Sequence, residues 1–310
     1  MKLIAPDYYP AFSCIADRCR HSCCVGWEID VDPDSLARYQ QLDGPLGQEL
    51  RDKIVLEEDC AHFRLGEDER CPFLNERGLC RMILGLGEDS LCQICTDHPR
   101  YRNYFCDREE LGLGLCCEAA GALILSREAP MSLVTLEDDG APEETDEFED
   151  LLTQVRSRAL AIVQDRSLTV EARMDRLLDE FQITMPDRTP AEWAEVYLSL
   201  EQMDGAWAPE LEKLKQPVPS CRLARFETAF EQLLVYFLYR HLSSAQDETD
   251  FPAYLAFAVL SCRVVRQLCA RTPNCTFEDL VELARLYSSE VEYDEDNTDA
   301  LIQLLWEVNN

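Results

Sequence analysis

The chain has 310 residues, with 29 lysines and arginines against 60 aspartates and glutamates, which gives a formal charge of −31. This charge excludes a protein that holds nucleic acid through a basic stripe and disfavours docking onto an anionic membrane surface. Apolar residues make up 46% and charged residues 29%, as in a folded soluble protein, and at about 150 residues per domain the length predicts about two domains.

The N-terminal segment MKLIAPDYYPAFSC has one lysine and a short apolar run that Pro6, Asp7 and Pro10 interrupt, so we expect no signal peptide. Every stretch of about 20 residues carries charge, so we expect no transmembrane helix. We therefore predict a cytoplasmic protein that makes no membrane contact. In that reducing compartment, clustered cysteines bind metal more often than they form disulfides.

Residues 1–128 carry twelve of the sixteen cysteines, three of the four histidines and frequent turn signals such as Asp43-Gly44-Pro45. Capping residues and Pro99 predict only short regular elements in this part. We expect helices over 34–41, 89–96 and 118–127 and a strand over 111–115. The prediction is a small, loop-rich α+β cysteine-cluster module over residues 1–128.

An acidic block follows, with nine acids and no base between Glu137 and Asp150. Such blocks are usually solvated, and we expect a linker over 137–150. Beyond it, apolar residues recur at spacings of three and four, and prolines separate the runs, which is typical of consecutive helices. The expected helices cover 144–164, 168–182, 191–203, 223–241, 254–269, 277–288 and 299–308. The predicted fold is mainly α, with the cysteine module followed by a helical domain over 129–310.

Two features of the helical part are expected to be packing features. His241 lies on an apolar helical seam, where a hydrogen-bonded core histidine is commoner than a metal ligand. Cys262 and Cys269 stand one heptad apart and are most simply small buried apolar residues.

The cysteines of the first 128 residues predict a metal site. Cys92 and Cys95 stand three residues apart, as do ligands that share one face of a helix. Thiolates select zinc or iron–sulfur clusters, and twelve buried thiols without a metal are the less favoured explanation. A structural zinc site usually has two CxxC knuckles and this chain has one, which favours an iron–sulfur cluster without excluding zinc.

Several ordered strings in this module resemble the bacterial flagellin lysine N-methylase family: YYPAFSCIADRCRHSCCVGWEIDVD, RCPFLNERGLC, LGEDSLCQICTDHPRYRN and LGLCCEAA. The segment around Cys71 and Cys80 is also similar to a zinc- or iron-chelating cysteine-cluster domain. The resemblance implies an enzyme of the bacterial flagellum system that transfers methyl groups from S-adenosylmethionine to flagellin lysines. It also implies a zinc or [4Fe–4S] centre with ligands among Cys14, Cys19, Cys23, Cys24, Cys71, Cys80, Cys95 and Cys117. Four cysteines fall outside the family pattern: Cys60, Cys92, Cys106 and Cys116.

Methyl transfer to lysine requires a neutral amine, and the ordinary lysine pKa is about 10.4, so the site must desolvate the amine or offer a base. Asp97 and His98 are candidate bases, although a helix end before Pro99 also explains them. Tyr8 and Tyr9 are candidates for orienting the amine. The only G-x-G, Gly112 to Gly114, runs into Cys116-Cys117 and is expected to be a strand, not a nucleotide loop.

Two alternatives to a methyltransferase stay open on the residues alone. One is a protein that chelates or senses zinc or iron without catalysis, and the other is an electron-transfer protein built around a cluster. Both are compatible with the missing donor-binding loop.

Overall fold

The computed structural model describes the chain except for residues 58–59, 141–145 and 219–222. It divides into two compact units. The cysteine unit comprises residues 13–101, and the helical unit comprises residues 1–12 and 102–310. Each unit is described by itself below.

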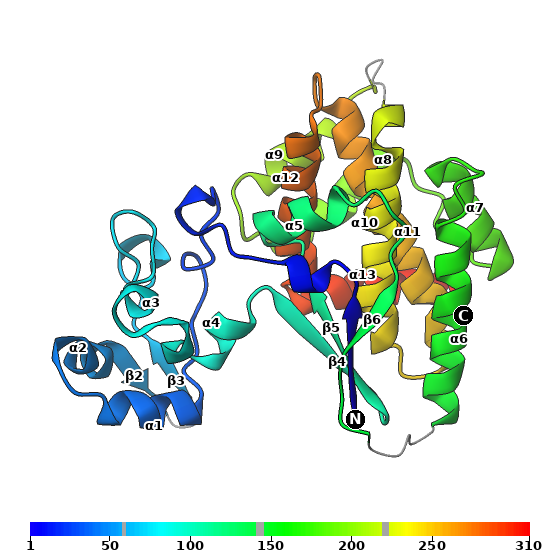
Figure 1. Ribbon diagram of the computed structural model, residues 1–310. Coiled ribbons are helices and arrows are strands. Elements are labelled where there is room, and N and C mark those ends of the chain that lie inside the picture. The colour runs from blue at the N-terminus through cyan, green and yellow to red at the C-terminus, as the bar shows by residue number, and fades with distance from the viewer. Residues whose placement is uncertain (58–59, 141–145, 219–222) are drawn as a thin grey trace. The chain divides into compact units, whose positions relative to one another are not determined.

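The helical unit confirms the prediction of a mainly α fold. Its α-helices are α5 (Glu118–Leu125), α6 (Glu147–Val163), α7 (Val170–Glu180), α8 (Pro190–Leu198), α9 (Trp207–Lys213), α10 (Glu227–His241), α11 (Phe251–Arg271), α12 (Phe277–Tyr287) and α13 (Glu295–Asn309). Helices α10 and α11 pack side by side at the centre of this unit (Figure 1), and α5, α6, α7, α12 and α13 pack around them.

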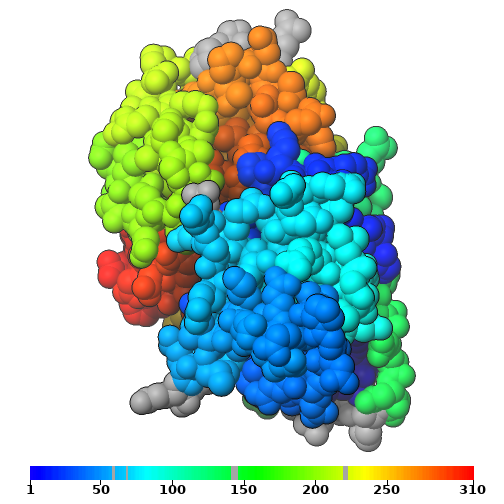
Figure 2. Space-filling view, turned by 90° about the vertical axis from the view of Figure 1, so that its left-hand side faces the viewer, coloured from blue at the N-terminus to red at the C-terminus, as the bar shows by residue number. Residues whose placement is uncertain are grey.

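The sequence explains where these helices begin. Thr189 and Thr276 cap α8 and α12, and in both cases an acid three residues on returns a hydrogen bond to the cap, which completes a capping box. The segment after α8 contacts α13 through Asn297, whose side chain accepts the amide of Glu201 at 3.0 Å. Figure 2 shows this contact region as yellow-green atoms above the red C-terminal helix.

A four-stranded sheet also belongs to the helical unit, in the order β4-β5-β1-β6. The strands are β1 (Lys2–Pro6), β4 (Arg100–Tyr104), β5 (Arg108–Leu113) and β6 (Leu133–Asp138). Strand β1 pairs with β5 in parallel and with β6 in antiparallel orientation. The expected strand over 111–115 is thus β5, shifted toward the N-terminus.

This sheet places the boundary between the units elsewhere than at residue 128. The N-terminal strand is an inner strand, so its backbone is paired on both sides by segments that the sequence analysis assigned to two different domains. Residues 1–12 and 102–128 therefore belong with the helices, and the cysteine unit is correspondingly smaller than the predicted module.

The described residues of the acidic block, 137–140 and 146–150, also lie in the helical unit, and residues 141–145 of the expected linker lie outside the described residues. Glu137 and Asp138 end β6, and Asp146 caps α6 by accepting the amides of Phe148 and Glu149. These described acids are exposed, except for half-buried Glu149. Because its two ends continue elements of one unit, the block does not separate the two observed units.

The cysteine unit is small and irregular, as predicted. Its elements are α1 (Pro33–Gln41), α2 (Pro45–Lys53), β2 (Ile54–Leu56), β3 (Ala61–Phe63), α3 (Arg81–Leu86) and α4 (Gln93–Asp97). Three aromatic rings centre its core: Tyr39 lies on Phe63 with ring centroids 6.3 Å apart, and Phe63 meets Phe73 edge-on at 5.1 Å. Two cysteines, Cys71 and Cys92, are buried in the same core.

Helix α11, with the turn before it, is long and apolar enough to cross a membrane by length and composition. However, 78% of the apolar window is buried inside the protein, which is the property of a core helix. Its cysteines at 262 and 269 are buried, as the sequence predicted.

A buried ion pair joins the sheet to the first long helix of the helical unit. Both oxygens of Glu110 in β5 accept from the Arg156 guanidinium of α6 at 2.7 Å, and the Arg108 Nε donates to Oε1 at 2.7 Å. Burial raises the pKa of the Glu110 carboxyl, but the two guanidiniums outweigh burial and hold the pKa below its ordinary value of 4.5. The carboxylate therefore stays charged at neutral pH.

We predict that Arg156→Met lowers the free energy of unfolding by about 3–5 kcal/mol, because it leaves the Glu110 charge buried with one partner fewer. The contribution of the pair is present above about pH 4.5, the unfolded value, and is lost as pH falls through the lower folded pKa. Urea unfolding at pH 7 and pH 3.5 measures both effects.

Arg158→Met, two residues along the same helix, is the matched control. Its pair with Glu180 is exposed, so it is expected to cost at most about 1 kcal/mol. Equal losses for the two variants would contradict a special role for the buried pair.

Candidate metal centre

Five cysteines belong to the core of the cysteine unit. Cys71 and Cys92 are buried, and partly buried Cys24, Cys80 and Cys95 pack against the same core. The thiols are close enough to perturb one another: the Cys95 thiol shares a hydrogen bond with Cys92, and Cys71 is influenced by Cys24, Cys80 and Cys92. We call these five residues the cysteine core.

Backbone pairing brings the first three members together. The amide of Cys71 donates to the carbonyl of Cys24 at 2.8 Å, which joins two segments far apart in sequence. The chain then turns back at Gly78, whose φ of +72° is readily available only to glycine, and Leu74 forms a bridge with Cys80. This turn brings the Cys80 segment back to the segment that begins at Cys71.

One carboxylate positions the other two members. Asp32 accepts the amide of Ser35 at 2.9 Å and so caps α1, and its second oxygen accepts the amide of Gln93 at 2.8 Å at the start of α4. Cys92 is the N-cap residue of α4 and Cys95 lies within it. The short helix that carries both thiols is therefore fixed to α1 through a single side chain.

Burial governs the electrostatics of the cysteine core. Burial raises the pKa of Cys71 to about 12 and also raises that of Cys80. The hydrogen bond between Cys92 and Cys95 lowers the pKa of Cys92 and raises that of Cys95. A hydrogen bond from Cys23 lowers the pKa of Cys24 to about 7. Several buried thiolates can coexist only beside a cation, and a bound metal deprotonates such thiols outright.

The other cysteines predicted from the family pattern lie outside this core. Cys14 and Cys23 are exposed, Cys19 is half-buried and donates to the carbonyl of His21 at 3.0 Å, and Cys117 belongs to the helical unit. Cys92, which the family pattern leaves out, is one of the two buried members. In the sequence, the three-residue spacing between Cys92 and Cys95 indicates that Cys92 could be a ligand.

The candidate catalytic residues are divided between the units. Asp97 and His98 lie at the end of α4 in the cysteine unit, where Asp97 accepts from Gln93 at 2.6 Å. His98 is half-buried near Trp27, with ring centroids 5.9 Å apart, and desolvation lowers its pKa to about 4. Its ring is therefore neutral at pH 7.

Tyr8 and Tyr9 belong to the helical unit. Tyr8 is buried, and burial together with the neighbouring Asp7 charge raises the pKa of its hydroxyl above the ordinary value. Tyr9 is half-buried and begins a short 3-10 turn. The Tyr8 hydroxyl is therefore protonated at neutral pH.

A polar cluster that the sequence did not predict is buried in the helical unit around Glu292. The Glu292 carboxylate lies 2.5 Å from Nε2 of His241, accepts from the Tyr236 hydroxyl at 3.0 Å and pairs with Arg240 at 3.3 Å. Glu292 ends a π-helical turn, Ser288–Glu292, a local irregularity common at functional sites. The prediction that His241 is a hydrogen-bonded core residue is consistent with this geometry.

The Cys116-Cys117 segment packs against this cluster. The amide of Leu115 donates to the Tyr236 hydroxyl at 3.2 Å, and burial raises the pKa of Cys116 to about 12. Gly114 lies close to two side chains: a Cβ on it would lie 2.7 Å from the Tyr293 hydroxyl and 3.1 Å from the Arg240 guanidinium, so the ends of those side chains would have to shift. This close packing agrees with the prediction that the G-x-G is not a nucleotide-binding loop.

Comparison with known proteins adds an independent observation. Residues 177–310 match the family model described as the FliB lysine N-methylase C-terminal domain. Over 136 residues, the chain is 29% identical to the lysine-N-methylases of Salmonella typhimurium and Salmonella choleraesuis, which is 41% of this chain and 33% of each relative. The flagellar biosynthetic protein FliU of Salmonella muenchen is also 29% identical over 136 residues, or 79% of its length. No solved structure matches.

The chain thus spans about a third of the length of the two lysine-N-methylases that it matches. The family model covers residues 177–310, from the end of α7 through α13, and it includes Tyr236, Arg240, His241 and Glu292. The predicted resemblance is therefore confirmed for residues 177–310, which are similar to the FliB lysine N-methylase C-terminal domain.

Proposed function

We propose that the protein is a protein-lysine N-methyltransferase that modifies flagellin with S-adenosylmethionine as the methyl donor. The observation that carries this proposal is the match of residues 177–310 to the lysine N-methylase C-terminal domain, supported by relatives that bear the name lysine-N-methylase. The FliU relative, named as a flagellar biosynthetic protein, supports flagellin as the substrate.

The charge of the chain suits that substrate. A formal charge of −31 attracts a cationic lysine side chain and favours encounter with it. The amine must then lose its proton before it attacks the sulfonium methyl group, and Asp97, His98, Tyr8 and Tyr9 stay the candidates for accepting or orienting it. The protein is proposed to act in the cytoplasm.

We further propose that the cysteine core holds a metal centre, either zinc or an iron–sulfur cluster. The donor set supports this: the five thiols Cys24, Cys71, Cys80, Cys92 and Cys95 share one core, and both zinc and iron–sulfur sites are built from thiolates. When bound, such a centre supplies a soft Lewis acid or an electron carrier. The chain's own contribution is to fix the thiols through the Asp32 bridge and the Gly78 turn.

Four of the eight proposed ligands lie inside this core and four lie outside it. Cys14, Cys19, Cys23 and Cys117 stay predictions of the family pattern, while Cys92 joins the proposed set on its position. One cubane cluster needs four thiolates, so the cysteine core alone suffices for one centre.

The first prediction concerns metal content. Protein purified without oxygen is expected to contain iron with sulfide, or zinc, and Cys92→Ser is expected to lose most of it because the substitution removes a buried thiol. Elemental analysis and sulfide assay measure this directly. Since a folded site organises the chain around it, chelation should also increase protease cleavage within residues 13–101.

Cys269→Ala is the control, because Cys269 is a buried packing residue of α11 in the other unit. Its metal content is expected to equal that of the unaltered protein. Full metal content in folded Cys92→Ser protein, or an unaltered protein that contains neither iron nor zinc, would refute the proposed centre.

The second prediction concerns methyl transfer. The unaltered protein with flagellin and S-adenosylmethionine is expected to produce methylated lysines, detected by mass spectrometry of tryptic peptides. Cys95→Ser is expected to reduce the yield at least tenfold, as loss of a positioned group typically does, whereas Cys269→Ala is expected to retain most activity. Circular dichroism checks that each variant is folded.

The outcomes separate the two halves of the proposal. Full activity in a folded, metal-free Cys95→Ser protein would make the centre dispensable and leave the methyltransferase standing. A metal-loaded protein that methylates none of the flagellins tested would instead favour the chelating or electron-transfer alternatives.

A further inference from the structure

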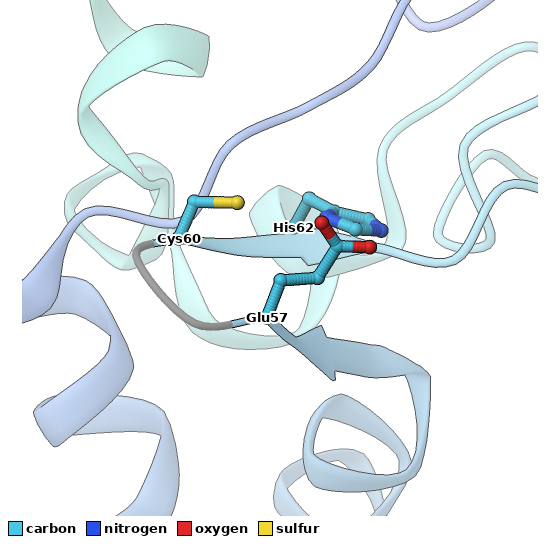
Figure 3. Close-up of side chains that lie close together, drawn as sticks. All are labelled: Glu57, Cys60 and His62. Carbon is cyan, nitrogen blue, oxygen red and sulfur yellow. The ribbon is translucent and has the colours of Figure 1, made fainter.

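A second group of metal-type ligands lies on the β2–β3 hairpin of the cysteine unit. One ligand atom from each of Glu57, Cys60 and His62 lies within 4.8 Å of the other two. Figure 3 shows the three side chains on one side of the hairpin, directed toward one another. We call these residues the hairpin triad.

The register of the hairpin explains why these residues meet. Val55 pairs with His62, and the Glu57 amide donates to the Cys60 carbonyl at 2.9 Å. Side chains alternate between faces along a strand and face each other across an antiparallel pair. Glu57, Cys60 and His62 therefore share one face.

The opposite face of the same hairpin carries the packing residues. Ala61 and Phe63 alternate with the triad along β3, and both are buried in the core that contains Cys71 and Cys92. The triad is therefore directed away from the cysteine core, and its ligands are distinct from the five thiols discussed above. This separation gives the triad an independent role.

His62 has an unsatisfied atom at this place. Its side chain is 13% exposed, and Nδ1 is buried without a hydrogen-bond partner among the described residues. Oε1 of Glu28 lies 3.9 Å from Nδ1, on the neighbouring segment that also pairs with β3. A buried imidazole nitrogen beside a carboxylate is typical of a metal-binding histidine with its supporting acid.

We propose that the hairpin triad binds a single Zn²⁺ ion through Glu57, Cys60 and His62, with Glu28 as the supporting carboxylate. Zinc accepts one thiolate, one imidazole and one carboxylate in a tetrahedral site, and three protein ligands leave the fourth position open to water or another ligand. Binding releases the Cys60 thiol proton to solvent while the sulfur lone pair forms the Zn–S bond. This site does not depend on the methyltransferase proposal.

The test is a zinc titration of the full-length protein as purified, with the core iron or zinc content measured beforehand. The unaltered protein is expected to bind one more equivalent of added Zn²⁺ than Cys60→Ser or His62→Ala, and to release protons as it binds, in isothermal titration calorimetry across buffers. Glu57→Gln, at an exposed position, is expected to raise the Kd at least about tenfold.

Glu76→Gln, an exposed glutamate of the same unit, is the matched control and should bind like the unaltered protein. The core metal content should stay the same in all four variants, which separates this site from the cysteine core. Equal zinc stoichiometry in the unaltered and Cys60→Ser proteins would overturn the proposal. An unchanged Kd in folded Glu57→Gln would exclude that residue as a ligand and with it the three-ligand site.

Discussion

Burial of several thiols in one small core is the constraint on which the cysteine unit depends. Apolar packing around Tyr39, Phe63 and Phe73 brings Cys71 and Cys92 out of water, and their environment favours the neutral thiol in Cys71. A cysteine buries less apolar area than a valine, leucine or isoleucine would at the same position, so packing alone does not explain why five cysteines occur in this core. A thiophilic cation would stabilise this core, because thiolates that repel one another become ligands of the same positive ion.

In the helical unit, two buried glutamates are paired with arginines. Glu110 is paired with Arg156 and Arg108, and Glu231 with Arg173 at 2.5 Å and Arg166 at 2.7 Å. Each carboxylate receives more than one charge-assisted hydrogen bond, which is needed to offset desolvation. These two buried acids are thus neutralised locally by arginines, whereas buried Glu290 accepts the amides of Met203 and Asp204 instead.

The sequence predicted those elements whose signal is local. The long helices follow from apolar spacing and caps, and α12 was predicted to within one residue. The sheet could not be predicted in this way, because KLIAP is too short to show alternation and its partner β5 lies about a hundred residues further on. The hairpin triad depends on strand register across the turn, which spacing alone does not reveal.

Family signal from two distant parts of the chain meets within the helical unit. The string LGLCCEAA, which carried part of the resemblance, ends β5 and begins α5, and its Leu115 amide donates to Tyr236 in the family-matched helix α10. Gly114 lies against the ends of the Tyr293 and Arg240 side chains, which a Cβ at this position would displace. An acid, a histidine and an arginine share one buried site next to Cys116, where tyrosine hydroxyls are held against them. Burying so many polar groups is costly unless they are hydrogen-bonded, and the π-helical turn that ends at Glu292 brings this carboxylate to His241 and Tyr236. The Gly114 segment, the π-helical turn and the polar cluster are therefore in contact with one another. A change in one of them affects the packing of the others.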